Sequence, residues 1–346
     1  MYNFQCDYTE GAHQKIIDAL VKTNMEQTSG YGVDVYCESA KEKIKLACGA
    51  PGADVHFLVG GTQTNTTVIS SVLRPYQGAV CAAQGHIAVH ETGAIEATGH
   101  KVLALPCENG KITAEQVKKY FADHFASETA EHEVQPGMVY ISFPTECGTI
   151  YSKDELAKLH AVCKEYDVPL YVDGARLGYG LADPRCDMTL PEFAANCDIF
   201  YIGGTKCGAL FGEAVVIMNK KYSPDFRYMI KRHGGMFAKG RLLGIQFDTL
   251  FTDNLYFEIT KRAVENAMRI RSAFEAKEIK FFGDSMTNQQ FPILSDEQIE
   301  FLSINSLPEF WCNAENGRKV VRFCTSWATT KEGVDTLVKD IESMNV

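Results

Sequence analysis

Residues 199–206 read Ile-Phe-Tyr-Ile-Gly-Gly-Thr-Lys, so that a lysine closely follows an apolar run. The run from Ile199 to Ile202 is too short for a helix and is followed by two glycines, which predicts a buried core strand. An ammonium group at the end of such a strand is costly unless it is paired or deprotonated. Lys206 is therefore the first candidate for chemistry in this chain.

A second apolar run, residues 170–172, ends in Asp173, with Arg176 three residues further on. Two neighbouring core strands that deliver Asp173 and Lys206 to one edge of a sheet suggest pyridoxal phosphate, which needs an amine for its Schiff base and a carboxylate for its ring nitrogen. Ligands of open α/β sheets bind at this edge. Two alternatives remain at this point: Asp173 caps a turn, and Lys206 extends from a strand end into solvent.

The composition narrows the class of protein. The chain has 346 residues, a formal net charge of -10, 23% charged and 45% hydrophobic residues, which are ordinary values for a soluble enzyme. The acidic balance argues against nucleic acid or a membrane surface as a partner. The 12 cysteines are scattered without a Cys-x-x-Cys pair, and the first residues lack the features of a signal peptide. We therefore expect reduced thiols and a cytoplasmic location.

Short apolar runs alternate with helical patterns through the first two thirds of the chain. We expect strands at 55–59, 79–82, 102–105, 138–143, 169–172, 198–202 and 214–218. Thr113 with Gln116, and Ser152 with Glu155, have the spacing of capping boxes that begin helices. This alternation predicts an α/β fold with a mostly parallel sheet that is covered by helices on both faces.

The pattern changes near residue 242. A long helical stretch runs through the apolar residues from Phe251 to Phe274, followed by strands at 291–294 and 320–324 and a last helix from about 331. We expect a large cofactor-binding α/β domain at 1–245 and a small α+β domain at 246–346, with the long helix as the connection.

Further residues could bind an anion. The turn that begins with Gly60, Gly61 and Thr62 follows a strand and opens a helix, so that its backbone N–H groups could hold a phosphate, although any such turn can carry glycines. The Thr205 hydroxyl could contact the same phosphate. Arg322 lies within an apolar strand, where it needs an anion. A substrate carboxylate and a protein ion pair are equally compatible with it, and the same alternatives apply to Arg176.

Two histidines lie four residues apart, at His86 and His90. This spacing occurs in metal sites on helices, but no full ligand set accompanies the pair, so we expect no metal. A flat imidazole that stacks on the cofactor ring is the better interpretation of His86, and His90 is expected to be structural.

Taken together, these residues resemble the threonine aldolase family of fold-type-I pyridoxal phosphate enzymes, which is grouped with the aromatic amino acid β-eliminating lyases. The resemblance covers nearly the whole chain in order and spacing. It rests on Tyr31-Gly32, Gly61-Thr62-Gln63, His86 with Glu91 and Gly93, Val172-Asp173-Gly174-Ala175-Arg176, Gly204-Thr205-Lys206, Gly234-Gly235-Met236 and Val321-Arg322.

The resemblance implies a role for each residue. Lys206 would form the internal aldimine, Asp173 would pair with the ring nitrogen and His86 would stack on the ring. Phosphate contacts are implied for Gly61 and Thr62. The substrate carboxylate would be bound by Arg176 and Arg322, and Tyr31 would lie near the active site across a subunit interface. A homotetramer, or a homodimer, with sites shared between subunits is the implied assembly.

The chain departs from the commoner family pattern at three places. It has Cys6-Asp7-Tyr8 where many members have Ser-Asp-Thr, and Pro144-Thr145-Glu146 where they carry a histidine near the substrate side chain. Phe237 replaces an expected arginine, so that Lys231, Arg232, Lys239 or Arg241 would take over that phosphate contact. These changes concern substrate specificity more than the cofactor.

The leading hypothesis is retro-aldol cleavage of a small β-hydroxy-α-amino acid, threonine or allo-threonine, to glycine and acetaldehyde, with Glu146 near the substrate hydroxyl. β-Elimination from a cysteine-, serine- or tyrosine-like substrate would use the same cofactor. A catalytically silent metabolite-binding protein and a zinc enzyme at His86 and His90 are more remote alternatives.

Overall fold

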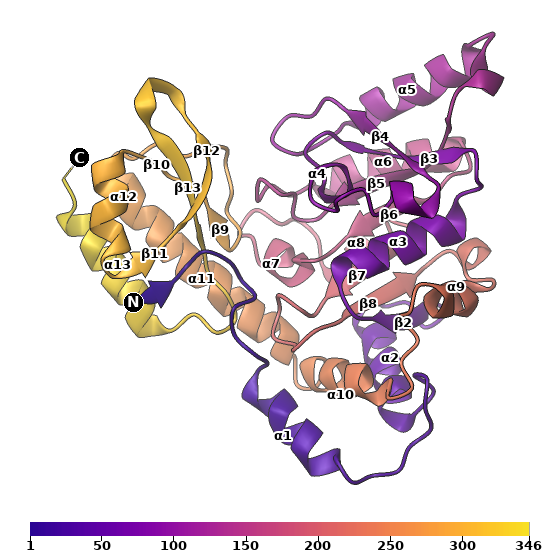
Figure 1. The fold of residues 1–346 in the computed structure, drawn as a ribbon, viewed down its shortest axis with the longest axis horizontal. Helices are drawn as coiled ribbons and strands as arrows, with labels where there is room; N and C mark the ends of the chain where they lie inside the picture. The colour runs from indigo at the N-terminus through magenta and orange to yellow at the C-terminus, as the bar shows by residue number, and fades with distance from the viewer. Residues whose placement is uncertain (346) are drawn as a thin grey trace.

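The computed structural model describes residues 1–345, which form a large and a small unit joined by a long helix (Figure 1). The large unit contains a seven-stranded sheet with the order β2-β8-β7-β6-β5-β3-β4. Its strands are β2 Asp54–Leu58, β3 Gln77–Ala82, β4 Lys101–Leu105, β5 Gln135–Ser142, β6 Leu170–Asp173, β7 Ile199–Gly203 and β8 Glu213–Ile217. Strand β8 runs opposite to the other six strands and so pairs antiparallel with both β2 and β7. The predicted strands and the mostly parallel sheet are therefore confirmed.

Helices cover both faces of this sheet because alternate strand residues point to opposite sides. Val80 and Ala82 pack into one apolar cluster, and Ala79 and Cys81 into another. The first cluster is completed by α2 Val35–Ala47, α5 Ala114–Ala126, α6 Lys153–Glu165, α8 Leu190–Ala194 and α10 Arg241–Leu250. The second is completed by α3 Gly61–Val72, α4 His86–Val89 and α9 Phe226–Arg232. Both predicted capping boxes are present, at α5 and α6.

Shorter elements connect these layers. Helix α1, Gln14–Thr23, packs on α10, and α7, Leu177–Leu181, follows β6. Four 3-10 turns lie at Glu96–Thr98, Ala130–His132, Lys220–Tyr222 and Glu315–Gly317. Within residues 1–345, every helix is too short or too polar to cross a bilayer.

The small unit has its own apolar cluster, which includes Phe274, Phe323 and Leu337. It consists of α11 Leu255–Ala276, β9 Gln289–Gln290, β10 Ile293–Leu294, α12 Asp296–Ser303, β11 Ser306–Leu307, β12 Glu309–Asn313, β13 Lys319–Cys324 and α13 Lys331–Ser343. The first strand of the chain, β1 Tyr2–Asn3, pairs with β11, and Phe4 joins the same cluster. The N-terminal arm thus lies with the small unit (Figure 1), although the division expected from the sequence assigns residues 1–245 to the large one.

The long helical stretch expected through residues 251–274 is present as α11, but it begins only at Leu255. Helix α10 ends before it, and between the two helices Asp253 and Asn254 adopt positive φ angles of 51° and 58°. Asp and Asn tolerate this left-handed conformation better than most residues do, so they can end one helix and begin another. Helix α11 leads from the large unit into the small one, and the segment between β1 and α1 is a second connection between them (Figure 1).

One edge of the central sheet collects the candidate residues. Strands β3, β5, β6 and β7 end there, and β8 begins there, because Ser142 pairs with Asp173 and Gly203 pairs with Glu213. Side chains that follow these strand ends therefore lie close together although they are far apart in the sequence.

Candidate active site

Asp173 lies at the centre of this edge, as the last residue of β6, and is only 4% exposed. Its Oδ1 accepts from the Tyr201 hydroxyl at 2.5 Å and the Ala175 N–H at 3.0 Å. Its Oδ2 accepts from the Tyr140 hydroxyl at 2.6 Å and the Asn65 amide at 3.1 Å. Burial raises the pKa of Asp173, but the charge of nearby His86 and the tyrosine hydroxyls outweigh it and leave the pKa lowered. The site therefore holds a buried carboxylate in its charged form.

Asn65, in the second turn of α3, links Asp173 to His86. Its side-chain oxygen accepts from the Tyr171 hydroxyl at 2.8 Å, and its amide also donates to Glu91 at 2.7 Å. Glu91 in turn lies 2.8 Å from Nδ1 of His86. Burial lowers the pKa of His86, but the Glu91 hydrogen bond and the charges of Asp173 and Glu91 leave it raised overall. Glu91 thus fixes the ring orientation and keeps a proton on Nδ1.

Glu146 lies behind His86, on the loop after β5. Its Oε1 accepts from the backbone N–H of His86 at 2.9 Å and from the Ser142 hydroxyl at 2.7 Å. Its Oε2 is buried without a hydrogen-bond partner among the described residues. Burial raises the pKa of Glu146. The carboxylate therefore supports the start of α4 and retains one oxygen that is free to accept a proton.

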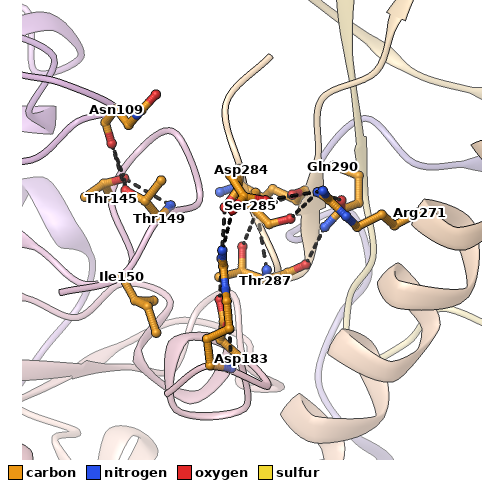
Figure 2. Close-up of polar contacts among 12 residues, drawn as sticks. Asn109, Thr145, Thr149, Ile150, Asp183, Arg271, Asp284, Ser285, Thr287 and Gln290 are labelled. Carbon is orange, nitrogen blue, oxygen red and sulfur yellow. Dashed lines mark hydrogen bonds and ion pairs between the residues drawn. The ribbon is translucent and has the colours of Figure 1, made fainter. Parts of the chain in front are cut away.

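The loop that carries Glu146 is bonded to Asn109 on one side and lies close to Ser285 on the other, and Figure 2 shows the polar contacts around both of these residues. Thr149 donates to the Asn109 carbonyl at 2.7 Å, and the Thr145 and Thr149 hydroxyls are 2.7 Å apart. Gly148 faces the small unit so closely that an added Cβ would lie 2.2 Å from Oγ of Ser285. The segment around Ser285 is anchored to the large unit through Asp284, which accepts from Arg185 at 2.7 Å. The docking of the small unit therefore helps to place Glu146.

Lys206 follows β7, and its Nζ lies 5.9 Å from the ring centre of Tyr8. Burial, followed by the positive charge of Arg176, lowers the pKa of Lys206. An amine with a lowered pKa is more readily deprotonated and nucleophilic. The adjacent Thr205 hydroxyl donates to Glu213 at 2.8 Å, so it points to a carboxylate rather than standing free for a phosphate.

The two candidate arginines both contact protein groups. Arg176 makes a two-pronged ion pair with buried Asp7, at 2.6 Å from Nε and 2.9 Å from Nη2. Arg322 donates to the Gln5 carbonyl, to Gln289 at 3.0 Å and to Glu309 at 2.5 Å. The guanidinium of Arg322 also lies 5.4 Å from the Trp311 ring centre.

The comparisons with known proteins agree with this geometry. Residues 3–326 match the family model described as beta-eliminating lyase. The chain belongs to the beta-eliminating lyase family. It is 28% identical to the low specificity L-threonine aldolase of Pseudomonas sp. (strain NCIMB 10558), over 99% of this chain and 97% of that protein. The solved threonine aldolase of Leishmania major is 42% identical, with a TM-score of 0.95, and 99% of each chain is covered.

A more distant structure shares the fold alone. Serine palmitoyltransferase from S. paucimobilis, solved with a PLP–myriocin adduct, has a TM-score of 0.70 at 14% identity, covering 99% of this chain and 86% of that one. The predicted fold-type-I architecture is therefore confirmed. Membership of the beta-eliminating lyase family makes the chain a lyase and implies pyridoxal phosphate as its cofactor.

The residues fit this cofactor. Asp173 is charged, as a partner of a protonated ring nitrogen must be, although the ring N–H would have to share the carboxylate with four existing donors. The 12-residue helix α3 begins at Gly61, and its N-cap residue Gly60 provides no side-chain cap. A Cβ at Gly60 would meet nothing within 4 Å, so an anion has room to approach this helix start.

Tyr31 lies outside this cluster. Its ring is 5.3 Å from Nζ of Lys231, its carbonyl accepts from Arg227 at 3.1 Å, and its N–H donates to the Ala238 carbonyl. Of the basic residues considered for the phosphate, Arg241 is occupied by the carbonyls of Thr23 and Glu26.

The two histidines do not form a metal site in the described residues. The His86 and His90 rings are 5.6 Å apart and tilted by 52°. Across residues 1–345, His, Cys, Asp and Glu side chains do not gather in a group of three or more that could hold a metal ion.

Several residues of the site were not identified from the sequence: Asn65, Tyr140, Tyr201, Glu213 and Gln289. The sequence could have indicated Asn65, since this residue lies one turn into a helix that begins at a glycine pair. Tyr140 and Tyr201 had none, because a tyrosine within an apolar strand looks like an ordinary core residue.

Proposed function

We propose that this chain uses pyridoxal phosphate to cleave a β-hydroxy-α-amino acid, with L-threonine or L-allo-threonine giving glycine and acetaldehyde. The observation that supports this most directly is the placement of charged Asp173, Lys206 and His86 at one sheet edge. The likeness to threonine aldolases over 99% of the chain supports the choice of substrate.

Each of the residues proposed to bind the cofactor would contact a different part of it. Lys206 would bind it covalently, Asp173 would hold its ring nitrogen and His86 would lie against its ring. The backbone of Gly60, Gly61 and Thr62 would take the phosphate at the start of α3, with the Thr205 turn beside it. When bound, pyridoxal phosphate supplies a sink for the electrons of the breaking bond.

The substrate carboxylate is expected at Arg176 and Arg322. Arg176 is fixed by its ion pair with Asp7, so it offers charge rather than a free guanidinium. Arg322 is paired with Glu309, a side chain that is 45% exposed and can move away. A carboxylate held between the two arginines would orient the Cα–Cβ bond, and such orientation contributes strongly to catalysis.

The reaction also needs a base for the substrate hydroxyl. As the Cα–Cβ bond breaks, the β-hydroxyl loses its proton, acetaldehyde leaves and Cα takes up a proton to give glycine. Oε2 of Glu146 has no hydrogen-bond partner among the described residues, and the raised pKa of Glu146 makes its carboxylate a better proton acceptor than an ordinary glutamate. We propose that Glu146 takes this proton directly or through a water.

β-Elimination is the second candidate, and the beta-eliminating lyase description of the matching family model favours it. It would begin with loss of the Cα proton and would expel the β-substituent, as water from serine or hydrogen sulfide from cysteine, after which hydrolysis gives pyruvate and ammonia. The residues that hold the cofactor would be the same, so the products distinguish the two reactions.

The test is an absorption spectrum of the purified protein with pyridoxal phosphate, before and after L-threonine and L-allo-threonine, with aldehyde and pyruvate assayed together. Lys206→Ala serves as the control. A visible cofactor band that the variant lacks, with aldehyde released by the wild type, supports the proposal. Pyruvate instead of aldehyde would favour elimination, and absence of the band in the wild type would overturn the cofactor assignment.

Assembly and location remain proposals as well. We expect a homotetramer or homodimer in which Tyr31, exposed at 49%, reaches a neighbouring subunit's site. A measured mass in solution, together with the effect of Tyr31→Ala on KM, tests this. We also predict a cytoplasmic location and a domain boundary near residue 245.

A further inference from the structure

Glu213 is a buried carboxylate for which the proposed reaction has no use. It is the first residue of β8 and only 3% exposed. Its Oε1 accepts from the Thr205 hydroxyl at 2.8 Å, and its Oε2 accepts from the Gly204 N–H at 3.1 Å. Both donors belong to the turn that carries Lys206. Glu213 is therefore attached directly to the segment that presents the candidate Schiff-base lysine.

The turn does not need a carboxylate to keep its shape. The N–H groups of Gly204 and Thr205 both donate to the Gly212 carbonyl, at 2.9 and 3.1 Å. The Gly212 N–H donates to the Thr205 hydroxyl oxygen at 3.0 Å. A neutral side chain could complete this network without the cost of burying a charge. The shape of the turn therefore does not explain why a carboxylate is buried at position 213.

The hydrogen-bond donors of Glu213 are an amide and a hydroxyl, both uncharged. Burial raises the pKa of Glu213 to about 8, with the charge of Lys206 acting in the opposite direction. Lys206 is affected in return, because the carboxylates of Asp7, Asp173 and Glu213 partly offset the effects of burial and Arg176 on its pKa. Each group thus changes the proton affinity of the other.

Other titratable groups face Glu213 from each element around it. The neighbours are Tyr171 and Asp173 on β6, Tyr201 on β7, Lys206 and Cys207 on the turn and Tyr256 on α11. Burial raises the pKa values of the three tyrosines and the cysteine, and that of Asp173 is lowered. Lys206, whose pKa is lowered, and Glu213, whose pKa is raised, are therefore the two groups in this set whose charge states depend on each other.

We propose that Glu213 is a positioning residue that holds the Lys206 turn and, through its charge, sets how firmly the Lys206 nitrogen keeps its proton. An ionised Glu213 stabilises a positive charge on that nitrogen, and a neutral Glu213 allows the proton to leave. This inference rests on the proposed function in one respect, namely that Lys206 carries the cofactor.

The test is Glu213→Gln in the full-length protein loaded with pyridoxal phosphate. Glutamine has nearly the same shape. Its oxygen can accept from Gly204 and its amide can donate to the Thr205 oxygen, so both residues stay in contact with the direction of the second hydrogen bond reversed. If Glu213 only supported the turn, Glu213→Gln should therefore behave as the wild type does. We expect the visible cofactor band to titrate at a lower pH in Glu213→Gln, by about one unit or more, because a negative charge near the nitrogen is lost.

A second readout does not involve turnover. Stopped-flow absorption follows the capture of pyridoxal phosphate by the cofactor-free protein, and its rate depends on the deprotonated fraction of Lys206. We expect the pH midpoint of this rate to fall in Glu213→Gln as well. Asp198→Asn is the matched control, because Asp198 is a buried carboxylate next to the opposite end of β7, and it should leave both midpoints unchanged.

The outcomes separate the two proposals. A wild-type protein that forms no visible band would overturn the proposed function itself. A band in both proteins with the same midpoint overturns the role of Glu213. If Glu213→Gln does not fold, infrared spectra of the wild type and of Glu146→Gln decide the question. A protonated carboxyl present in both should ionise over the pH range in which the visible band titrates, and its absence would overturn the inference.

Discussion

The deep part of the site and its mouth are built in different ways. The deep part comprises Asp173 and its four donors, which all lie on the central sheet, on α3 or in the turn after β6. The mouth is assembled from distant segments: Arg176 pairs with Asp7, and Arg322 binds the carbonyl of Gln5, which is 317 residues away in the chain. Strand register therefore fixes the deep part, whereas the mouth depends on how the N-terminal arm and the small unit dock.

This difference predicts different consequences of mutation. A substitution in the deep part should lower turnover and leave the fold intact, because strand pairing places these residues independently of their side chains. A change in the mouth should affect stability or substrate affinity, because its ion pairs are themselves the contacts that join the segments.

Lys206→Ala should have the largest effect. Removing the amine abolishes covalent attachment of the cofactor, so we expect turnover to fall by at least about 10³-fold. The visible band should be lost, with little change in the midpoint of thermal unfolding of the cofactor-free protein. Lys261→Ala, on the exposed surface of α11, is the control and should behave as the wild type. Activity within tenfold of the wild type would remove Lys206 from the mechanism.

Asp173→Asn should follow, with a fall in turnover of about 10²- to 10³-fold. A neutral amide cannot keep the ring nitrogen protonated, although it has nearly the same shape. Because the pKa of Asp173 is held below its usual range, wild-type kcat should show no ionisation of this group above about pH 4. The measurement is kcat for L-threonine as a function of pH. A loss of less than threefold would show that the charge of Asp173 is not used.

The deep part of the site could be predicted from the sequence to a larger extent than the mouth. Lys206 and Asp173 could be predicted because Asp173 directly follows one apolar run, Lys206 follows another after a short Gly-Gly-Thr turn, and strand ends meet at one sheet edge. Gly60 and Gly61 were readable for the same reason. The pairing of Asp7 with Arg176 was not, because no local pattern reports which segment docks on an arginine from 169 residues away. The helix break at Asp253 and Asn254 was missed because the apolar spacing continues across it.

Asp7→Asn should be the most destabilising change in the mouth. It leaves Arg176, whose side chain is only 14% exposed, without its counter-charge, and removing one partner of such a largely buried pair typically costs about 3–5 kcal/mol of unfolding free energy. Burial raises the pKa of Asp7, but Arg176 and Lys206 outweigh it and leave the pKa lowered. The contribution of Asp7 is therefore full above its unfolded pKa, about 3.9, and is lost as the pH falls through its folded value.

Urea unfolding at neutral pH and near pH 3.5 tests this, since the difference between wild type and Asp7→Asn should shrink at the lower pH. Asp123→Asn is the matched control, because its ion pair with Lys119 is exposed on α5 and should contribute about 0–1 kcal/mol. An equal effect of the two substitutions would mean that the pair of Asp7 and Arg176 contributes no more than a surface contact.

Glu309→Gln should have the smallest effect, and it acts on substrate affinity. Glu309 is 45% exposed and occupies Arg322, so a substrate carboxylate has to compete with it for the same guanidinium. Because Glu309 is the exposed partner and can reach water, we expect the pair to contribute about 0.2–1 kcal/mol, so KM for L-threonine should fall by about 1.4- to 5-fold while kcat stays unchanged. Glu300→Gln, on the exposed face of α12, is the control. A rise in KM would instead mean that Glu309 holds Arg322 in the orientation that binds the substrate, and the mouth would then be as preorganised as the deep part of the site.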